Sequence, residues 1–226
     1  MIPACKGCLR GRVVDAYVRH KVRSSFRGVW LRGELPPAPE GLLVYANHGN
    51  WWDGFVLHPL ARAARRDGYV LMEEENLRRY AFLRHVGAFS LRRGDASSSL
   101  ETLRYARALL QRPGAAVFLF PEGEHRPPGE LPLRLERGVE TLARMSRVRS
   151  VPVAIRYAFF EHERPDVLLD VGAPHPPVAP LEFQRRLEER VVALQAVTRL
   201  EGFQRLVAGQ PGVAERWDAV RARSRP

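Results

Sequence analysis

Short apolar runs that end in polar clusters, separated by stretches of helical spacing, constrain the fold of this chain most strongly. The run 42–46 lies between a Pro- and Gly-rich turn at 36–41 and the polar segment 47–53. An apolar run between turn signals predicts a buried strand. Further strands are expected at 68–72, 88–91, 115–120, 150–157 and 167–171, and helices at 55–64, 76–85, 100–110, 136–147 and over much of 181–206. This alternation predicts an α/β fold with a mainly parallel central sheet flanked by helices.

Residues 9–31 carry apolar side chains at roughly helical spacing, with arginines and Lys21 between them. Two interpretations remain open for this segment. A basic helix with aromatic residues on its apolar side can lie in a bilayer interface, and Trp30 is typical of that position. An ordinary amphipathic helix packed on the core explains the same spacing.

The charge of the chain points to an anionic partner. The formal net charge is +11, and Lys6 and Lys21 are the only lysines, so arginine supplies nearly all of the positive charge. Nucleic acid and an anionic lipid surface both attract such a chain. No stretch approaches the roughly 18 apolar residues of a transmembrane helix, and the N-terminus lacks the apolar run of a secretory signal. We therefore expect a cytoplasmic protein, free or attached to a membrane surface.

Cys5 and Cys8 form a C-x-x-C pair near the N-terminus. A zinc site needs about four ligands, and the chain has no second pair. Nothing strand-like precedes Cys5, as a redox motif of this spacing would require. We assign these cysteines no role and expect no metal.

Polar clusters follow three of the expected strands, at 48–53, 92–95 and 121–126. In open α/β sheets, ligands bind beyond the carboxyl ends of the strands. The three clusters are therefore expected to converge on one cleft.

The segment His48-x-x-x-x-Asp53 can supply general-base chemistry. A neutral imidazole removes a proton from a hydroxyl when a carboxylate fixes its tautomer and stabilises the imidazolium that forms. In a regular helix two residues five apart point about 140° apart. We therefore expect His48 in the turn before a helix and Asp53 in its first turn. The alternative is that Asp53 only interacts with the helix N-terminus, and that His48 is a loop residue.

Four blocks in this chain resemble those of the glycerolipid acyltransferases, the family that contains 1-acylglycerol-3-phosphate acyltransferase. The blocks are Asn-His-x-x-x-x-Asp at 47–53, Gly followed by apolar residues and Arg at 87–93, Phe-Pro-Glu-Gly at 120–123, and an apolar strand with proline at 151–153. They occur in the family order. The resemblance implies a glycerol-phosphate acyltransferase-like fold. It divides the chain into a basic segment 1–35, a candidate membrane-surface anchor, and an acyltransferase domain 36–226.

The resemblance also implies the roles of individual residues. His48, oriented by Asp53, would deprotonate an acceptor hydroxyl that attacks an acyl thioester. Arg93 would bind the acceptor phosphate, which suits a guanidinium–phosphate pair. Glu122 and Gly123 belong to the acceptor-binding block. The donor would be acyl-CoA or acyl carrier protein, used as co-substrate without a metal or other cofactor.

One departure from the family pattern bears on the acceptor. Family members often continue the third block with Thr-Arg-Ser, whereas this chain has Glu124-His125-Arg126. Arg126 lies one position later than the arginine of the family pattern, and it is the candidate for that arginine's role in acceptor binding. The departure leaves another lysophospholipid, a lipid-linked amino acid or a glycolipid open as acceptor.

The sequence thus predicts O-acyl transfer to a lysophospholipid, foremost 1-acylglycerol-3-phosphate, in phospholipid biosynthesis or remodelling. The protein would be peripheral on the cytoplasmic side of the cell membrane, with an acyl-chain tunnel beside the cleft. An acyltransferase acting on a sugar or pigment glycoside is the first alternative. A non-enzymatic basic protein that binds membrane or nucleic acid is the second, but no nucleic-acid-binding signature is present and we expect no nucleic-acid partner.

Overall fold

A computed structural model describes residues 1–7 and 9–223, so Cys8 lies outside the described residues. The helices are α1 Leu9–Ser25, α2 Asp53–Ala63, α3 Glu74–Arg79, the 3₁₀ helix η1 Ala81–Val86, α4 Ala96–Leu110, α5 Gly138–Ser146, α6 Pro180–Gln195 and α7 Val213–Arg223. The strands are β1 Gly28–Arg32, β2 Leu42–Ala46, β3 Asp67–Glu73, β4 Ala88–Leu91, β5 Ala115–Leu119, β6 Arg149–Ala158, β7 Asp166–Val171 and β8 Gln204–Ala208.

The described residues form an eight-stranded sheet in the order β4-β3-β5-β2-β6-β7-β1-β8. The pairs β3/β4, β3/β5, β2/β5, β2/β6 and β1/β7 are parallel. The pairs β6/β7 and β1/β8 are antiparallel. The predicted α/β fold with a mainly parallel sheet is therefore confirmed.

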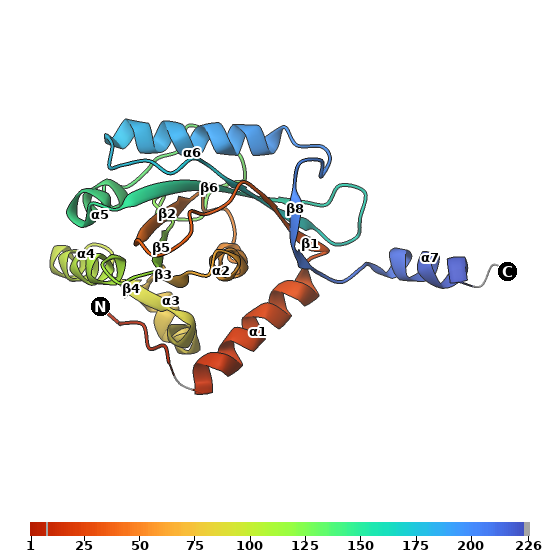
Figure 1. Cartoon of the computed structure of the whole chain (residues 1–226), viewed down its shortest axis with the longest axis horizontal. Coiled ribbons are helices and arrows are strands. Elements are labelled where there is room, and N and C mark those ends of the chain that lie inside the picture. The colour runs from red at the N-terminus through yellow and green to blue at the C-terminus, as the bar shows by residue number, and fades with distance from the viewer. Residues whose placement is uncertain (8, 224–226) are drawn as a thin grey trace.

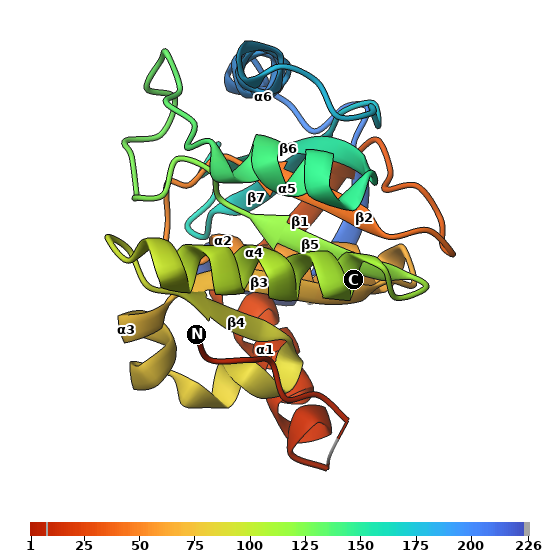
Figure 2. The same cartoon turned by 90° about the vertical axis from the view of Figure 1, so that its left-hand side faces the viewer.

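Helices cover both faces of this sheet (Figure 1). Coverage on both faces is clearest at strand β2, where all five side chains are buried. Leu43 and Tyr45 belong to the apolar cluster shared with α4, α5 and α6, whereas Val44 and Ala46 belong to the cluster shared with α1 and α2. A strand buried on both faces reads as an unbroken apolar run, the pattern found at 42–46. Seen from the side, α4 and α5 lie across one end of the sheet (Figure 2).

The N-terminal segment is only partly helical. Helix α1 buries Val14, Val18 and Val22 against the core and ends at Ser25. The expected helical continuation to residue 31 is wrong, because Gly28–Arg32 forms β1 between β7 and β8. Strand formation here depends on partners more than 130 residues away in sequence, which periodicity within 9–31 does not reveal.

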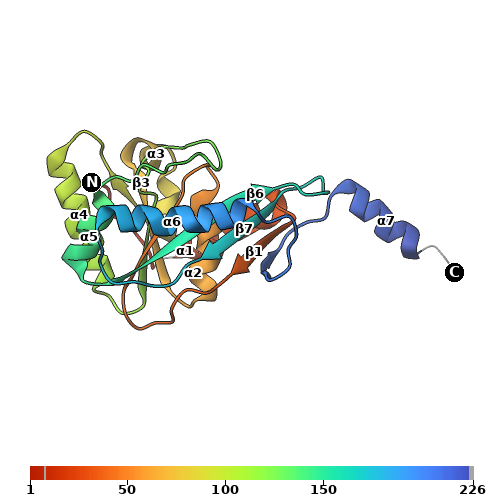
Figure 3. The same ribbon diagram turned by 90° about the horizontal axis from the view of Figure 1, so that it is seen from above.

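The C-terminal region also differs from its prediction. The helix expected over much of 181–206 ends at Gln195, and Gln204–Ala208 pairs antiparallel with β1 as the edge strand β8. Helix α7 then extends away from the body of the molecule (Figures 1 and 3).

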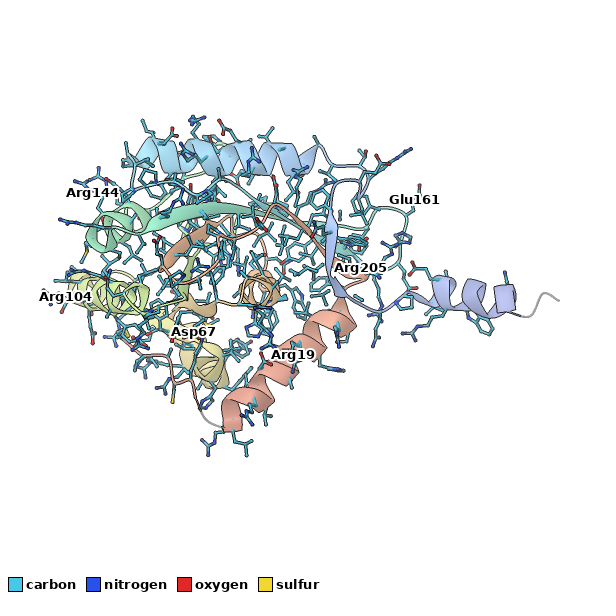
Figure 4. The ribbon with its side chains drawn as sticks, viewed as in Figure 1. Arg19, Asp67, Arg104, Arg144, Glu161 and Arg205 are labelled. Carbon is cyan, nitrogen blue, oxygen red and sulfur yellow. The ribbon has the colours of Figure 1, made fainter. Side chains whose placement is uncertain are left out.

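The arginine side chains are spread over the molecular surface. Figure 4 labels Arg19 on α1, Arg104 on α4, Arg144 on α5 and Arg205 on β8. All four side chains are exposed. The positive charge therefore surrounds the sheet on several sides.

Candidate active site

The first motif block lies where the central strand β2 meets α2. At the end of β2, the Asn47 side chain donates to the carbonyl of Ile155 at 3.0 Å and accepts from its N–H at 2.8 Å. This pair of hydrogen bonds ties the loop to the neighbouring strand β6. The direction of the chain after β2 is thereby set, and with it the position of His48.

His48 and Asp53 are in direct contact. His48 Nδ1 lies 2.9 Å from Asp53 Oδ2, with His48 in the loop and Asp53 as the first residue of α2. The geometry expected from the spacing is therefore confirmed. Because Nδ1–H donates a hydrogen bond to the carboxylate, the lone pair of the neutral ring lies on Nε2.

The Asp53 carboxylate is held by a complete set of donors. Its Oδ2 also accepts from the backbone N–H groups of Gly49 at 3.0 Å and Asn50 at 2.9 Å. Its Oδ1 accepts from the Tyr157 hydroxyl at 2.7 Å. Burial raises the pKa of Tyr157 well above its usual value, so the hydroxyl stays a donor at neutral pH. A carboxylate only 1% exposed is thus fixed toward the imidazole.

Two rings enclose the imidazole of His48. Phe120 stacks on it with a centroid distance of 4.3 Å and an interplanar angle of 18°. The ring centroid of His125 lies 4.1 Å from that of His48. Partial burial lowers the pKa of His125, and the neighbouring His48 is a second cause. His125 was not predicted as a site residue, although it lies in the altered part of the third block.

Glu122 connects the third block to the first. Its Oε1 accepts the backbone N–H of His48 at 2.8 Å, and the side chain is buried. Burial raises the pKa of this carboxyl, and its Oε2 has no hydrogen-bond partner. Gly123 follows in a left-handed conformation, and its N–H donates to the carbonyl of Phe120.

Arg126 lies on the same loop but faces carboxylates. Its backbone N–H donates to the carbonyl of His48 at 2.9 Å. Its guanidinium nitrogens lie 2.9 Å from Glu124 Oε1, 3.8 Å from Glu122 Oε2 and 3.9 Å from Glu130 Oε1.

The two arginines of the second block differ in their surroundings. Arg92 pairs with Glu74 at 2.7 Å, and the hydrogen bonds from Arg92 and Arg78 lower the pKa of Glu74 to about 2. Arg93 is exposed and has no hydrogen bond or ion pair within the described part of the chain. Its guanidinium lies against Gly123, where a Cβ would come within 2.7 Å of a terminal nitrogen. A side chain at 123 would displace Arg93, so glycine fits this position.

A cavity of about 830 Å³ opens beside His48. His48, Arg93, Gly123 and His125 line its polar part. Its remaining wall is mostly apolar and includes one face of α2 together with side chains of β3, η1 and α4. The cavity can therefore accommodate a molecule with a polar head and an apolar tail.

Sequence reasoning missed Tyr157. This residue lies on β6, and 104 positions separate it from Asp53, so no local spacing connects the two.

Within residues 1–7 and 9–223, no group of three or more His, Cys, Asp or Glu side chains is arranged to hold a metal ion. None of the described helices has the length and apolar character to cross a bilayer.

The fold and the site together define an α/β protein with a His–Asp pair at the carboxyl edge of a mainly parallel sheet, opening on an apolar cavity. The model of the Acyltransferase family matches residues 30–156, more than half of the chain and all four motif blocks. The chain belongs to the acyltransferase family. The resemblance drawn from the motif blocks is thereby confirmed.

Among solved structures, the fold is similar to the 1-acyl-sn-glycerophosphate (LPA) acyltransferase PlsC from Thermotoga maritima. The TM-score is 0.58 at 19% sequence identity, over 84% of this chain and 81% of that chain. A further match, to the pilus retraction motor PilT with bound ADP, has a TM-score of 0.31 at 10% identity over 70% of this chain and 54% of that chain, too low to support an argument. No curated protein sequence matches this chain significantly.

Proposed function

We propose that this acyltransferase moves a fatty acyl group from acyl-CoA or acyl carrier protein to the hydroxyl of a lysophospholipid, foremost 1-acylglycerol-3-phosphate. The observation that supports this most strongly is the contact between His48 Nδ1 and Asp53 at the polar end of an apolar cavity. The PlsC structure with the similar fold is, by its name, an acyltransferase of this acceptor class.

In the proposed reaction, His48 Nε2 takes the proton of the acceptor hydroxyl while the oxygen attacks the thioester carbonyl. Asp53 stabilises the imidazolium that forms. The tetrahedral intermediate then expels the thiolate, which takes the proton from His48. The products are an ester and a free thiol, and the imidazole is neutral again. General-base assistance of this kind contributes about 10²–10⁴-fold to the rate.

The cavity offers separate places for the two ends of the lipid. Arg93 has no partner among the described residues and can form charge-assisted hydrogen bonds with the acceptor phosphate. Glu122 does not line the cavity and its buried Oε2 faces Arg126, so it supports the site through the hydrogen bond that it accepts from the backbone N–H of His48. Gly123 leaves room for Arg93 beside it. The apolar wall along α2 suits an acyl chain.

An acceptor screen tests this proposal. Purified protein is incubated with acyl-CoA and, in parallel, with 1-acylglycerol-3-phosphate, other lysophospholipids, a lyso-form of a lipid-linked amino acid, a glycolipid and a pigment glycoside, and products are identified by mass spectrometry. We expect the diacyl product of 1-acylglycerol-3-phosphate to dominate. A product from the glycolipid or pigment glycoside alone would overturn the proposed acceptor, and no acyl product from any acceptor would overturn the activity.

Glu122→Gln should raise the thermal stability at pH 8 while it lowers the rate of acyl transfer. Because the pKa of Glu122 is raised in the folded state, the folded protein holds this proton more tightly than the unfolded chain, and the group destabilises the fold increasingly as pH rises. The amide oxygen of Gln can still accept from His48 N–H. We therefore expect a Tm above that of the wild type at pH 8, little difference at pH 4, and acyl transfer lowered about tenfold. A Tm equally lowered at both pH values would show that the carboxylate supports the fold.

We also propose that the protein binds the cytoplasmic membrane surface through the outer face of α1. Leu9, Val13 and Tyr17 lie one turn apart and are 76%, 63% and 41% exposed. Tyr17 contacts Phe82 of η1 at 5.7 Å, which extends this apolar stripe toward the cavity. Trp51, at the cavity wall, is 44% exposed. A lipid acceptor could pass from the bilayer to His48 along this side.

Vesicle sedimentation tests the membrane proposal. We expect binding to vesicles that contain anionic lipid and loss of binding at high salt, because each arginine near the surface contributes about 1 kcal/mol. The double variant Leu9→Gln/Val13→Gln should weaken binding at least about tenfold, since apolar burial is lost. The matched control is Leu181→Gln on α6, which is 78% exposed on the opposite side of the sheet. Equal binding of both variants would exclude α1 as the docking surface.

A further inference from the structure

The arginine of the third block is surrounded by negative charge. Arg126 carries one positive charge, whereas Glu122, Glu124 and Glu130 all lie within 4 Å of its guanidinium. Even with Glu122 protonated, two carboxylates remain around one cation. A phosphate would be repelled from this cluster at these distances. Arg126 is therefore poorly placed to bind an anionic head group.

The contacts of Arg126 point to a different task. Its backbone N–H donates to the carbonyl of His48, and its Nε and Glu122 Oε2 are both buried and face each other at 3.8 Å. Glu122 in turn accepts the backbone N–H of His48. Both backbone groups of His48 are thus held by this loop. Arg126 is a positioning residue for the segment that carries the imidazole.

A second arginine without a partner lies in the same cavity as Arg93. Arg137 directly precedes α5, is exposed, and lines the cavity together with Gly138. No hydrogen bond or ion pair engages the Arg137 side chain in the part of the chain that the structure covers. Arg93 and Arg137 are therefore both available to an anion.

The start of α5 is fixed close to Arg93. The backbone N–H of Glu136 donates to the carbonyl of Pro121 at 2.7 Å, which attaches this segment to the third block. A Cβ on residue 123 would lie 2.7 Å from a terminal nitrogen of Arg93 and 3.6 Å from Glu136 Cγ, so these two side chains lie side by side at Gly123. Arg137, the next residue, thus directly precedes α5 within reach of the head-group end of the cavity.

The first turn of α5 adds uncharged donors to this pair. The first N–H groups of a helix have no partner within the helix and favour anions. Gly138 and Val139 line the cavity, and the space where a Cβ of Gly138 would lie is open. The one acidic residue of this turn, Glu140, is paired with Arg144 at 2.9 Å. The local charge at the start of α5 therefore comes from Arg137 and its neighbour Glu136.

We propose that Arg93 and Arg137, with the first-turn amides of α5, bind the phosphate of a phosphomonoester acceptor, and that Arg126 holds the His48 loop instead. This inference rests on the proposed function for its substrate. It assigns to Arg137 the role in phosphate binding that the family pattern gives to the arginine of the third block, here Arg126. Glu136 lies beside the pair and weakens its attraction for an anion.

Kinetics with two acceptors test the assignment. With acyl-CoA and 1-acylglycerol-3-phosphate, Arg137→Gln should raise KM about ten- to a hundredfold with kcat nearly unchanged, and Glu136→Gln should lower KM. With monoacylglycerol, which lacks the phosphate, neither change should alter KM. Arg134→Gln is the matched control, because Arg134 is an exposed arginine three residues away that does not line the cavity. Arg126→Gln should lower kcat for both acceptors, and Arg126→Lys should restore part of it.

Binding of inorganic phosphate, measured by calorimetry on the full chain, tests the site without turnover. We expect weaker binding in Arg93→Gln and Arg137→Gln, and wild-type binding in Arg134→Gln and Arg126→Gln. Unchanged phosphate binding in Arg137→Gln, or a KM raised equally for both acceptors, would overturn the inference. If the wild type transfers no acyl group, the proposed function fails, whereas the phosphate comparison still decides the role of Arg137.

Discussion

His48→Ala should abolish acyl transfer while the protein stays folded. The imidazole lies at the polar end of the cavity with its Nδ1 engaged by Asp53, so its Nε2 can take a proton from the acceptor hydroxyl. Loss of general-base assistance is expected to lower kcat about 10²–10⁴-fold. The measurement is release of free CoA from acyl-CoA in the presence of lysophospholipid. The side chain is partly exposed, so its removal should shift Tm only slightly.

His20→Ala is the matched control for this experiment. His20 is an exposed histidine on α1 that does not line the cavity, and the variant should release CoA at the wild-type rate. Equal rates for His48→Ala and the wild type would remove His48 from the reaction. A large fall in Tm for His48→Ala would instead point to a structural role, and His48→Gln would then separate the two effects.

Asp53→Asn should lower kcat about 10²–10⁴-fold with little loss of stability. Asparagine can keep an oxygen toward the N–H groups of Gly49 and Asn50 and turn its amide toward the Tyr157 hydroxyl, which can also accept. The shape of the site is then kept, but the charge that stabilises the imidazolium is gone. Acyl transfer and thermal unfolding, measured on the same preparation, check both parts of this expectation.

Asp53→Ala provides the contrasting variant. It leaves two backbone donors and the Tyr157 hydroxyl without a partner in a buried site, and each unsatisfied group costs about 1–3 kcal/mol. We expect a clear fall in Tm in addition to the loss of activity. A Tm for Asp53→Asn as low as that of Asp53→Ala would mean that the charge of Asp53 serves the fold, and normal activity in Asp53→Asn would contradict its role beside His48.

The local sequence pattern was sufficient to predict the central sheet and the contact between His48 and Asp53. The run 42–46 is apolar at every position because both of its faces are buried, and the five-residue spacing from 48 to 53 places the pair across a loop and a helix start. These are relations between neighbours in sequence. Where pairing partners are distant, the predictions were wrong: Gly28–Arg32 was assigned to a helix, and Gln204–Ala208 was not recognised as a strand.

The sequence by itself determined which chemistry-bearing residues the chain has, and it predicted the contact of His48 with Asp53 on the condition that His48 lies in the turn before the helix. Only the tertiary structure decided which charges are free. Arg126 and Arg93 look equivalent in the sequence, yet Arg126 is surrounded by three carboxylates and Arg93 by none within the described residues. Tyr157 likewise reaches Asp53 only because β6 lies beside β2. Packing brings such groups within a few ångströms of each other, and electrostatic and hydrogen-bond energies depend on that distance and not on separation along the chain.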